Sequence, residues 1–258
     1  MSNQAHTRKI QGYGWLPDLP DHRDLLYAPP PETQKQLPPA ASVRDALPPV
    51  FDQGQLGSCT GNAIAAADEF EAAKQGIDFG TPSRLFIYYG EREIEGTVDQ
   101  DSGAMIRDGF KVLANEGAPP ETDWPYDISK FAQRPPDNAY ADAQKHRAIS
   151  YQSVAQNSSS LRTCIADGYP FVFGFTVYES FESQEVARTG TVEMPGAGER
   201  TLGGHAVVGV GYEDASQRFT VRNSWGEGWG DSGYFTMPYA YLLDSNLASD
   251  FWTLRSLA

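Results

Sequence analysis

The hydrophobic periodicity of the chain changes near Gly168, and this change limits the folds that the sequence can adopt. Before Gly168, apolar residues recur at the three- and four-residue spacing of amphipathic helices. After it, runs of apolar β-branched and aromatic residues predict strands. Helices in one half and strands in the other predict an α+β protein of two lobes, with a cleft where the lobes meet.

The helical stretches begin and end at recognisable residues. The first runs from Ser58 to a stop at Gly76 and is expected to cross a core, since its alanines and Phe70 share one face. The second has Thr81 as its expected N-cap and Pro82 at the first helical position. The sequence further predicts a helix over residues 104–116, an irregular bridge to about residue 160, a short helix ending at residue 168, and strands over residues 170–177, 205–212, 218–223, 233–237 and 251–254.

Length and charge exclude several classes of protein. A chain of 258 residues with 40% hydrophobic content can bury a sizeable core. The net charge of −14 disfavours a nucleic-acid partner or a polybasic membrane-surface protein. No apolar run approaches the roughly 18 residues of a membrane span, and residues 1–11 lack the apolar core of a secretory signal. We expect a monomer without a membrane partner, located in the cytoplasm or secreted without a classical signal peptide.

Residues 1–45 differ from the rest of the chain in composition and periodicity. They mix aromatic, charged and proline residues without helical or strand periodicity, and proline pairs and a triplet favour an extended connector. A disordered tail is the simpler interpretation. We nevertheless expect this segment to pack on the body, because it carries several large apolar side chains: Trp15, Leu16, Leu19, Leu25, Leu26 and Tyr27.

Cys59 lies where a glycine-rich loop becomes the first turn of a helix. The unpaired backbone donors and the dipole of a helix N-terminus favour a thiolate at such a position. Six residues upstream, the Gln53 side-chain amide is a candidate donor to an oxyanion. An inert, buried cysteine is the alternative interpretation. Cys164 lies on an amphipathic helix face and is expected to be a core residue.

His205 is the strongest candidate among four histidines for a base that would act on this thiol. It opens a predicted strand after Gly203 and Gly204, which leave room for a substrate backbone. A second motif begins at Asn223, whose amide oxygen can fix the orientation of an imidazole, and Trp225 can shelter that hydrogen bond from water. Purely structural roles remain open for both motifs at this point.

In this order, these motifs resemble the papain family of cysteine peptidases. Gln53, Cys59, His205 and Asn223 match the family's oxyanion glutamine, nucleophile, general base and orienting asparagine. Residues 223–230 match the family signature Asn-Ser-Trp-Gly-x-x-Trp-Gly. The resemblance covers roughly residue 47 to the C-terminus. It implies a papain-like fold with a helical N-terminal lobe, an antiparallel β-barrel-like C-terminal lobe and the active-site cleft between them.

The resemblance also implies substrate contacts and a branch of the family. Leu56 stands where many members carry a disulfide cysteine, and Thr60 replaces the usual tryptophan. In this the chain is similar to disulfide-free bacterial members, including the xylellain-like branch. The residues that match substrate-binding positions are Gly103, Met105, Gly174, Gly204, Ala206 and Trp225.

The implied function is that of an endopeptidase that forms an acyl-enzyme on Cys59 and needs no metal or cofactor. Peptides or proteins are the expected substrates. We expect residues 1–45 to form an inhibitory, zymogen-like segment ahead of a peptidase domain over residues 46–258. Two alternatives stay open, a non-catalytic peptide-binding module and a thiol-dependent acyl transferase.

Overall fold

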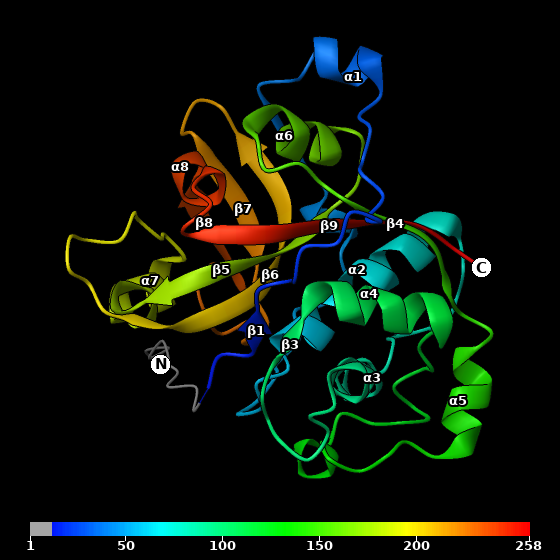
Figure 1. Cartoon of the computed structure of the whole chain (residues 1–258). Helices are drawn as coiled ribbons and strands as arrows, with labels where there is room; N and C mark the ends of the chain where they lie inside the picture. The colour runs from blue at the N-terminus through cyan, green and yellow to red at the C-terminus, as the bar shows by residue number, and fades with distance from the viewer. Residues whose placement is uncertain (1–11) are drawn as a thin grey trace.

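The computed structural model describes residues 12–258, which form a helical lobe and a sheet lobe (Figure 1). The elements of the first half are β1 (Trp15–Leu16), α1 (Pro31–Lys35), β2 (Ala40–Ser42), the 3-10 helix η1 (Arg44–Ala46), α2 (Cys59–Gln75), α3 (Arg84–Glu95), β3 (Ala104–Met105), α4 (Ile106–Asn115), η2 (Ile128–Lys130), α5 (Asp137–Ala143), β4 (Ala148–Ser153) and α6 (Ser158–Ala166). The second half contains β5 (Phe171–Tyr178), η3 (Glu179–Glu182), α7 (Gln184–Thr189), β6 (Thr201–Glu213), β7 (Arg218–Arg222), β8 (Tyr234–Pro238), α8 (Tyr239–Leu243) and β9 (Ala248–Leu257).

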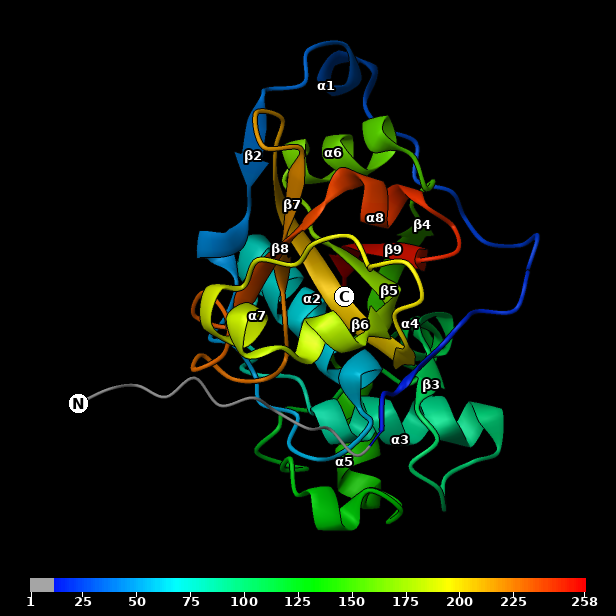
Figure 2. The same ribbon diagram turned by 90° about the vertical axis from the view of Figure 1, so that its left-hand side faces the viewer.

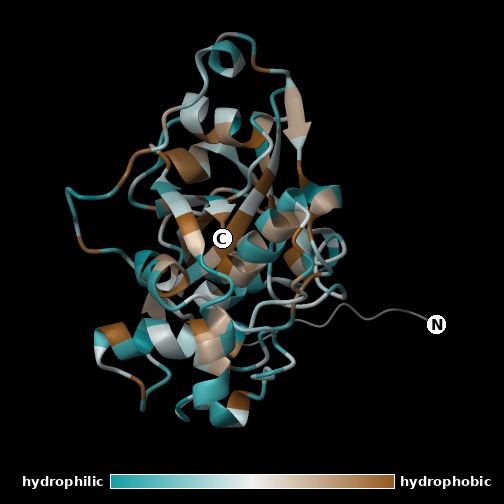
Figure 3. Cartoon of the chain, turned by 90° about the vertical axis from the view of Figure 1, so that its right-hand side faces the viewer, coloured by the Kyte–Doolittle hydropathy of each residue, from teal (hydrophilic) through white to brown (hydrophobic). Residues whose placement is uncertain are grey.

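One antiparallel sheet organises the C-terminal lobe. Its strand order is β4-β9-β5-β6-β7-β8, and β2 pairs with β6 beside this path. Large apolar side chains fill its interior, with Phe171, Phe173 and Phe175 fully buried along β5. Hydrophobic colour in Figure 3 follows the central strands, whereas the peripheral helices carry mixed colours. The predicted two-lobed α+β fold is confirmed.

Helix α2 joins the two lobes. Most of its residues from Cys59 to Ala72 are buried, because its small alanine side chains let neighbouring elements approach from several sides. Ala63 shares a core cluster with Val208 of β6 and Leu254 of β9. The helix ends as predicted at Gly76, whose φ of 73° is the left-handed conformation that glycine adopts without strain. Its N-terminus therefore lies at the junction of the lobes.

Several local predictions differ from the structure. Strand β6 begins at Thr201, so His205 lies inside it and does not open it, and residues 104–105 form β3 and not the start of a helix. The N-cap of α3 is Ser83 and not Thr81, because the Ser83 hydroxyl accepts a hydrogen bond from the Phe86 N–H. The bridge predicted to be irregular contains α5 and strand β4. This strand is stabilised by antiparallel pairing with β9. The last strand begins at Ala248, before its predicted start at residue 251. Pairing partners distant in sequence decide these last two cases.

The N-terminal segment packs across the body. In Figure 2 it passes from β1, next to β3, along one side of the molecule to α1. Trp15 and Tyr27 are buried, and Ser153 of β4 exchanges backbone hydrogen bonds with the segment at Leu25 and Tyr27. The predicted packing is therefore confirmed for the aromatic side chains, whereas four leucines are exposed: Leu16, Leu19, Leu25 and Leu26. Residues 1–11, which also belong to the predicted segment, lie outside the described residues.

The described part of the chain contains neither a membrane-spanning helix nor a cluster of side chains that could hold a metal ion. Between residues 12 and 258, no helix has the length and apolar character needed to cross a membrane. Within the same residues, no group of three or more histidine, cysteine, aspartate or glutamate side chains is arranged to hold a metal ion.

Candidate active site

Cys59 and His205 come together where α2 meets β6. Cys59 is the first residue of α2, and both side chains are fully buried. The backbone N–H of Ala206, which follows His205, donates to Cys59 Sγ at 3.4 Å. Residues 146 positions apart in the sequence thus share one site because α2 packs against β6.

Asn223 holds the imidazole of His205. His205 Nε2 and Asn223 Oδ1 lie 2.8 Å apart, and the Ser224 N–H donates to the same oxygen at 2.8 Å. Because this oxygen can only accept, Nε2 carries the proton and the Nδ1 side of the ring is turned toward other groups. The Trp225 ring lies 5.3 Å from the His205 ring, centroid to centroid, and is buried. The predicted shelter of this hydrogen bond is therefore present in the geometry.

Gln53 is tied to the same loop as Asn223. The Ser224 hydroxyl donates to Gln53 Oε1 at 2.6 Å, and Gln53 Nε2 donates to the Leu56 carbonyl at 2.9 Å. The Gln53 N–H also donates to the Ser224 carbonyl. These contacts fix the amide with its nitrogen away from Ser224, and one of its two N–H donors remains for another acceptor. Sequence reasoning missed Ser224 as the link, although it stands directly after Asn223.

The thiol of Cys59 is protonated in this arrangement. Burial raises the pKa of Cys59 to about 12, although the backbone N–H groups of Ala206, Gly14 and Thr60 oppose this shift. The physical cause of the high pKa is the exclusion of water from the thiol. A part of that exclusion comes from the N-terminal segment.

Three residues of the N-terminal segment fill the cleft. The Tyr13 ring meets the His205 ring edge-on, with centroids 5.8 Å apart. The Gly14 backbone lies near enough to the Cys59 thiol to lower its pKa, and the Gly14 carbonyl accepts from the Ala104 N–H at 2.8 Å. Trp15 follows into the region of the predicted substrate-binding residues. The sequence predicted that the N-terminal segment packs on the body, but not which of its residues lie at Cys59 and His205.

The predicted substrate-binding residues surround this segment. A Cβ atom added to Gly103 would lie 2.4 Å from the Gly14 oxygen, so only glycine permits this approach. Met105 pairs with Leu16 in the short parallel β1–β3 ladder. Gly174 and Gly204 lie against the Trp15 ring, and Ala206 pairs with Gly174 between β5 and β6. The structure thus brings these residues together around the N-terminal segment, and Trp225 packs against His205.

Thr60 and Leu56 have packing roles. The Thr60 hydroxyl donates to Glu91 Oε2 at 2.7 Å inside the helical lobe, and burial raises the pKa of Glu91 well above its usual range. Leu56 is buried in a cluster with Trp124 and Phe86. Thr60 and Leu56, the two residues that depart from the usual family sequence, are therefore both buried in contacts within the helical lobe. Both cysteines are free, and Cys164 is fully buried, as expected of a core residue.

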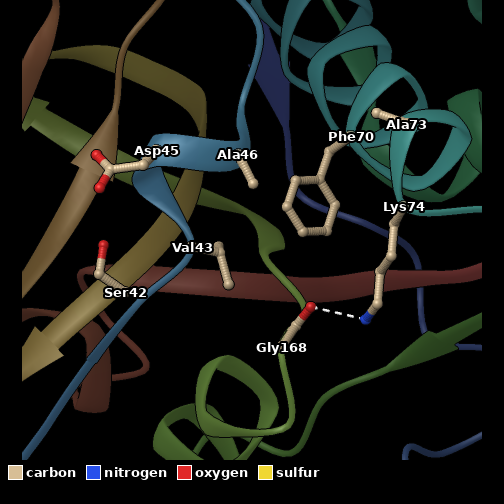
Figure 4. A pocket seen from close by; sticks show the side chains of 8 residues that line it. All are labelled: Ser42, Val43, Asp45, Ala46, Phe70, Ala73, Lys74 and Gly168. Atoms are coloured by element: carbon tan, nitrogen blue, oxygen red, sulfur yellow. Dashed lines mark hydrogen bonds between the residues drawn. The ribbon is translucent and has the colours of Figure 1, made fainter.

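A separate pocket of about 440 Å³ lies between α2 and η1 (Figure 4). In Figure 4 the Lys74 ammonium reaches across to the Gly168 carbonyl, a hydrogen bond of 2.8 Å. None of the candidate catalytic residues lines this pocket, so it does not belong to the site at Cys59. Its lining residues are Ser42, Val43, Asp45, Ala46, Phe70, Ala73, Lys74 and Gly168.

Comparisons with known proteins agree with this geometry. The model of the papain family of cysteine proteases matches residues 37–250. An uncharacterized peptidase C1-like protein of Acanthamoeba polyphaga mimivirus is 40% identical, over 96% of this chain and 88% of its own length. The structure of xylellain, a cysteine protease from Xylella fastidiosa, is 44% identical with a TM-score of 0.90, covering 97% of this chain and 98% of that one.

A more distant structure shares the fold. Procathepsin B S9 from Trypanosoma congolense has a TM-score of 0.74 at 16% identity, over 96% of this chain and 87% of that chain. The fold is thus kept where little sequence identity remains. A match over most of the chain, a two-lobed fold and a thiol beside an asparagine-held imidazole lead to one conclusion: this chain belongs to the papain family of cysteine proteases and is a hydrolase.

Proposed function

We propose that this protein is a cysteine endopeptidase in which Cys59, His205 and Asn223 carry out acyl transfer, and that residues up to about 45 inhibit it. The observation that carries the catalytic part is the set of hydrogen bonds made by Ser224, which join Asn223 to Gln53 in the separate loop that leads to Cys59. A site with only structural duties would not need an amide donor and an imidazole fixed around one buried thiol.

In the proposed reaction, Cys59 transfers its proton to His205 and attacks the scissile carbonyl carbon, forming a tetrahedral intermediate. The second Gln53 Nε2 hydrogen and the Cys59 backbone N–H stabilise the oxyanion. The imidazolium then protonates the leaving amine as the carbon–nitrogen bond breaks. Water, deprotonated by His205, attacks the thioester and releases the acid and the thiol.

The hydrogen bond to Asn223 orients the ring for both proton transfers. Because Asn223 Oδ1 accepts from Nε2, the protons exchanged with the substrate pass through Nδ1. A neutral amide partner leaves the imidazolium charge available to the thiolate, whereas a carboxylate partner would compete for that charge. The ion pair of thiolate and imidazolium forms once the thiol is solvated.

The direction of the N-terminal segment supports inhibition without cleavage. Tyr13 lies beside His205, where a leaving amine must be protonated, and Trp15 lies on the Gly174–Gly204 side. In a substrate the leaving amine belongs to the C-terminal part, whereas Tyr13 precedes Gly14. The segment therefore runs opposite to a substrate, and it presents the N–H of Gly14 to the thiol in place of a carbonyl carbon.

The boundary at residue 45 stays a proposal. Strand β2 lies before it and pairs with β6 of the body, so the part of the segment that can leave without breaking the sheet ends before Ala40. The monomeric state and the location in the cytoplasm, or outside the cell by a signal-independent route, also stay predictions.

The test uses the full chain with a protease recognition sequence inserted after Ala28, which is exposed. We expect an epoxysuccinyl probe to label the cut protein much faster than the uncut protein, and Cys59→Ala to abolish labelling of both. Equal labelling rates before and after the cut would contradict inhibition by the segment. Hydrolysis of a peptide panel by the cut His205→Ala protein would refute the mechanism.

A further inference from the structure

A polar network connects the two ends of the loop that runs from Gln53 to Ser58. At its centre the Tyr126 hydroxyl donates to the Gln53 carbonyl at 2.8 Å. The Ser58 hydroxyl forms a hydrogen bond with the same tyrosine oxygen, and Asn62 Nδ2 lies 3.3 Å from it. Because the single hydroxyl proton of Tyr126 goes to Gln53, Ser58 is the donor in its own bond. One hydroxyl thus joins the residue that carries the oxyanion amide to the residue before the thiol.

Asn62 holds the peptide group that carries the Cys59 N–H. The backbone N–H of Asn62 donates to the Ser58 carbonyl at 3.0 Å, and its Nδ2 donates to the same carbonyl at 2.9 Å. The Ser58 carbonyl and the Cys59 N–H belong to one planar peptide unit, so the two bonds that fix the carbonyl also fix the direction of the N–H. Asn62 and Ser58 are both buried, so water does not compete for these bonds.

Arg84 fixes the orientation of the Asn62 amide. Its Nη1 donates to Asn62 Oδ1 at 3.1 Å, which leaves Nδ2 for Ser58 and Tyr126. Its Nε and Nη2 donate to the two carboxylate oxygens of Glu121 at 2.8 and 2.6 Å. The guanidinium carbon lies 4.0 Å from the centroid of the Tyr126 ring. Every one of these partners lies outside the N-terminal segment, so the network remains when the segment leaves.

The network reaches both donors of the proposed oxyanion hole. It holds the Gln53 amide through the Gln53 carbonyl and the Cys59 N–H through the Ser58 carbonyl. We propose that Tyr126 is a positioning residue whose hydroxyl, held by Asn62, keeps the Gln53 amide in place relative to the Cys59 N–H. Tyr126 acts through Gln53 and is not itself catalytic. This inference rests on the proposed function and adds a residue to its mechanism.

The test is Tyr126→Phe in the protein that is cut after Ala28. Phenylalanine keeps the ring beside Arg84 and removes only the hydroxyl. We expect kcat for a peptide substrate to fall about tenfold with KM unchanged, because a displaced donor weakens binding of the transition state and not of the substrate. The matched control Tyr140→Phe removes another hydroxyl of the helical lobe and should change kcat less than twofold. An unchanged kcat in Tyr126→Phe would overturn the proposal.

A double-mutant cycle shows whether Tyr126 acts through Gln53. In a chain that already carries Gln53→Ala, Tyr126→Phe should lower kcat less than twofold, since the amide that the hydroxyl positions is gone. A tenfold loss in both backgrounds would overturn the proposal, because the hydroxyl would then act by another route, such as the general stability of the lobe.

A readout that needs no turnover compares a peptide aldehyde with the amide of the same sequence. The Cys59 sulfur adds reversibly to the aldehyde carbon, and the thiol proton passes to the former carbonyl oxygen, which lies where the oxyanion forms. Each compound is measured for its ability to protect Cys59 from iodoacetamide. Tyr126→Phe should raise the protecting concentration of the aldehyde about tenfold and leave that of the amide unchanged. An equal change for both compounds would overturn the proposal.

The same measurements on Gln53→Ala separate this proposal from the function on which it rests. If Gln53→Ala weakens hydrolysis and aldehyde protection whereas Tyr126→Phe changes neither, only the positioning role is refuted. If Gln53→Ala changes neither, the proposed oxyanion hole is refuted together with the role of Tyr126. A tenfold loss in Tyr126→Phe that disappears in the Gln53→Ala background supports both.

Discussion

Replacing Trp15 with alanine should open the cleft and expose the thiol. Trp15 is 7% exposed and donates to Asp250. Truncation of a buried tryptophan typically costs about 3–5 kcal/mol. Here that cost falls mainly on the docked segment, since the indole contacts the floor of the cleft from a short, two-residue strand. A change of about 3 kcal/mol in docking corresponds to a rise of about 150-fold in the open fraction, until opening is complete.

The assay is the rate at which Cys59 in the full chain reacts with an epoxysuccinyl probe at constant pH. We expect a rise of up to about 150-fold in Trp15→Ala. The matched control is Leu19→Ala on the same segment, because its side chain is 68% exposed and its removal should change the rate less than twofold. Unchanged near-ultraviolet circular dichroism of the body would show that both variants remain folded. Equal rates in Trp15→Ala and the parent chain would refute the view that the indole holds the segment in place.

Two further predictions concern the oxyanion donor and the pH dependence of docking. Gln53→Ala in the opened chain should lower kcat by about 10²–10³-fold with little change in KM, since the donor acts on the transition state; a change confined to KM would contradict this role. Burial, and then the neighbouring Asp250 carboxyl, raise the pKa of Asp18 from 3.8 to about 7 in the docked segment. Docking should therefore be tightest below about pH 4, where both states hold the proton, and should weaken until about pH 7. The ratio of the labelling rate of the parent chain to that of Asp18→Asn should rise over this range, and a constant ratio would exclude Asp18 as the titrating group.

The candidate catalytic residues could be found in the sequence because their spacing and neighbours are local. Cys59 stands at a loop-to-helix change, and Asn223 opens a tryptophan-glycine motif. Neither position depends on a long-range contact to be recognised. The same holds for the end of α2 at Gly76, where a residue with no side chain permits a left-handed conformation.

The contacts between these motifs could not be predicted from short stretches of sequence. The Ser224 hydroxyl that holds the Gln53 amide joins residues 171 positions apart, and Thr60 finds Glu91 only when α2 packs on α3. Strand β4 was predicted as irregular because its alternation is weak, and its structure comes from hydrogen bonds to β9. In each case the partner is supplied by the fold.

The sequence by itself determined the two-lobed α+β architecture and the candidate catalytic residues, because periodicity and residue type are properties of short stretches. Only the tertiary structure decided that Tyr13 meets His205, that β1 pairs in parallel with β3, and that Asp250 accepts from the Trp15 indole. The reason is physical: burial of the indole and the pairing of a carboxyl with two distant N–H donors are gained only when segments more than 200 residues apart meet.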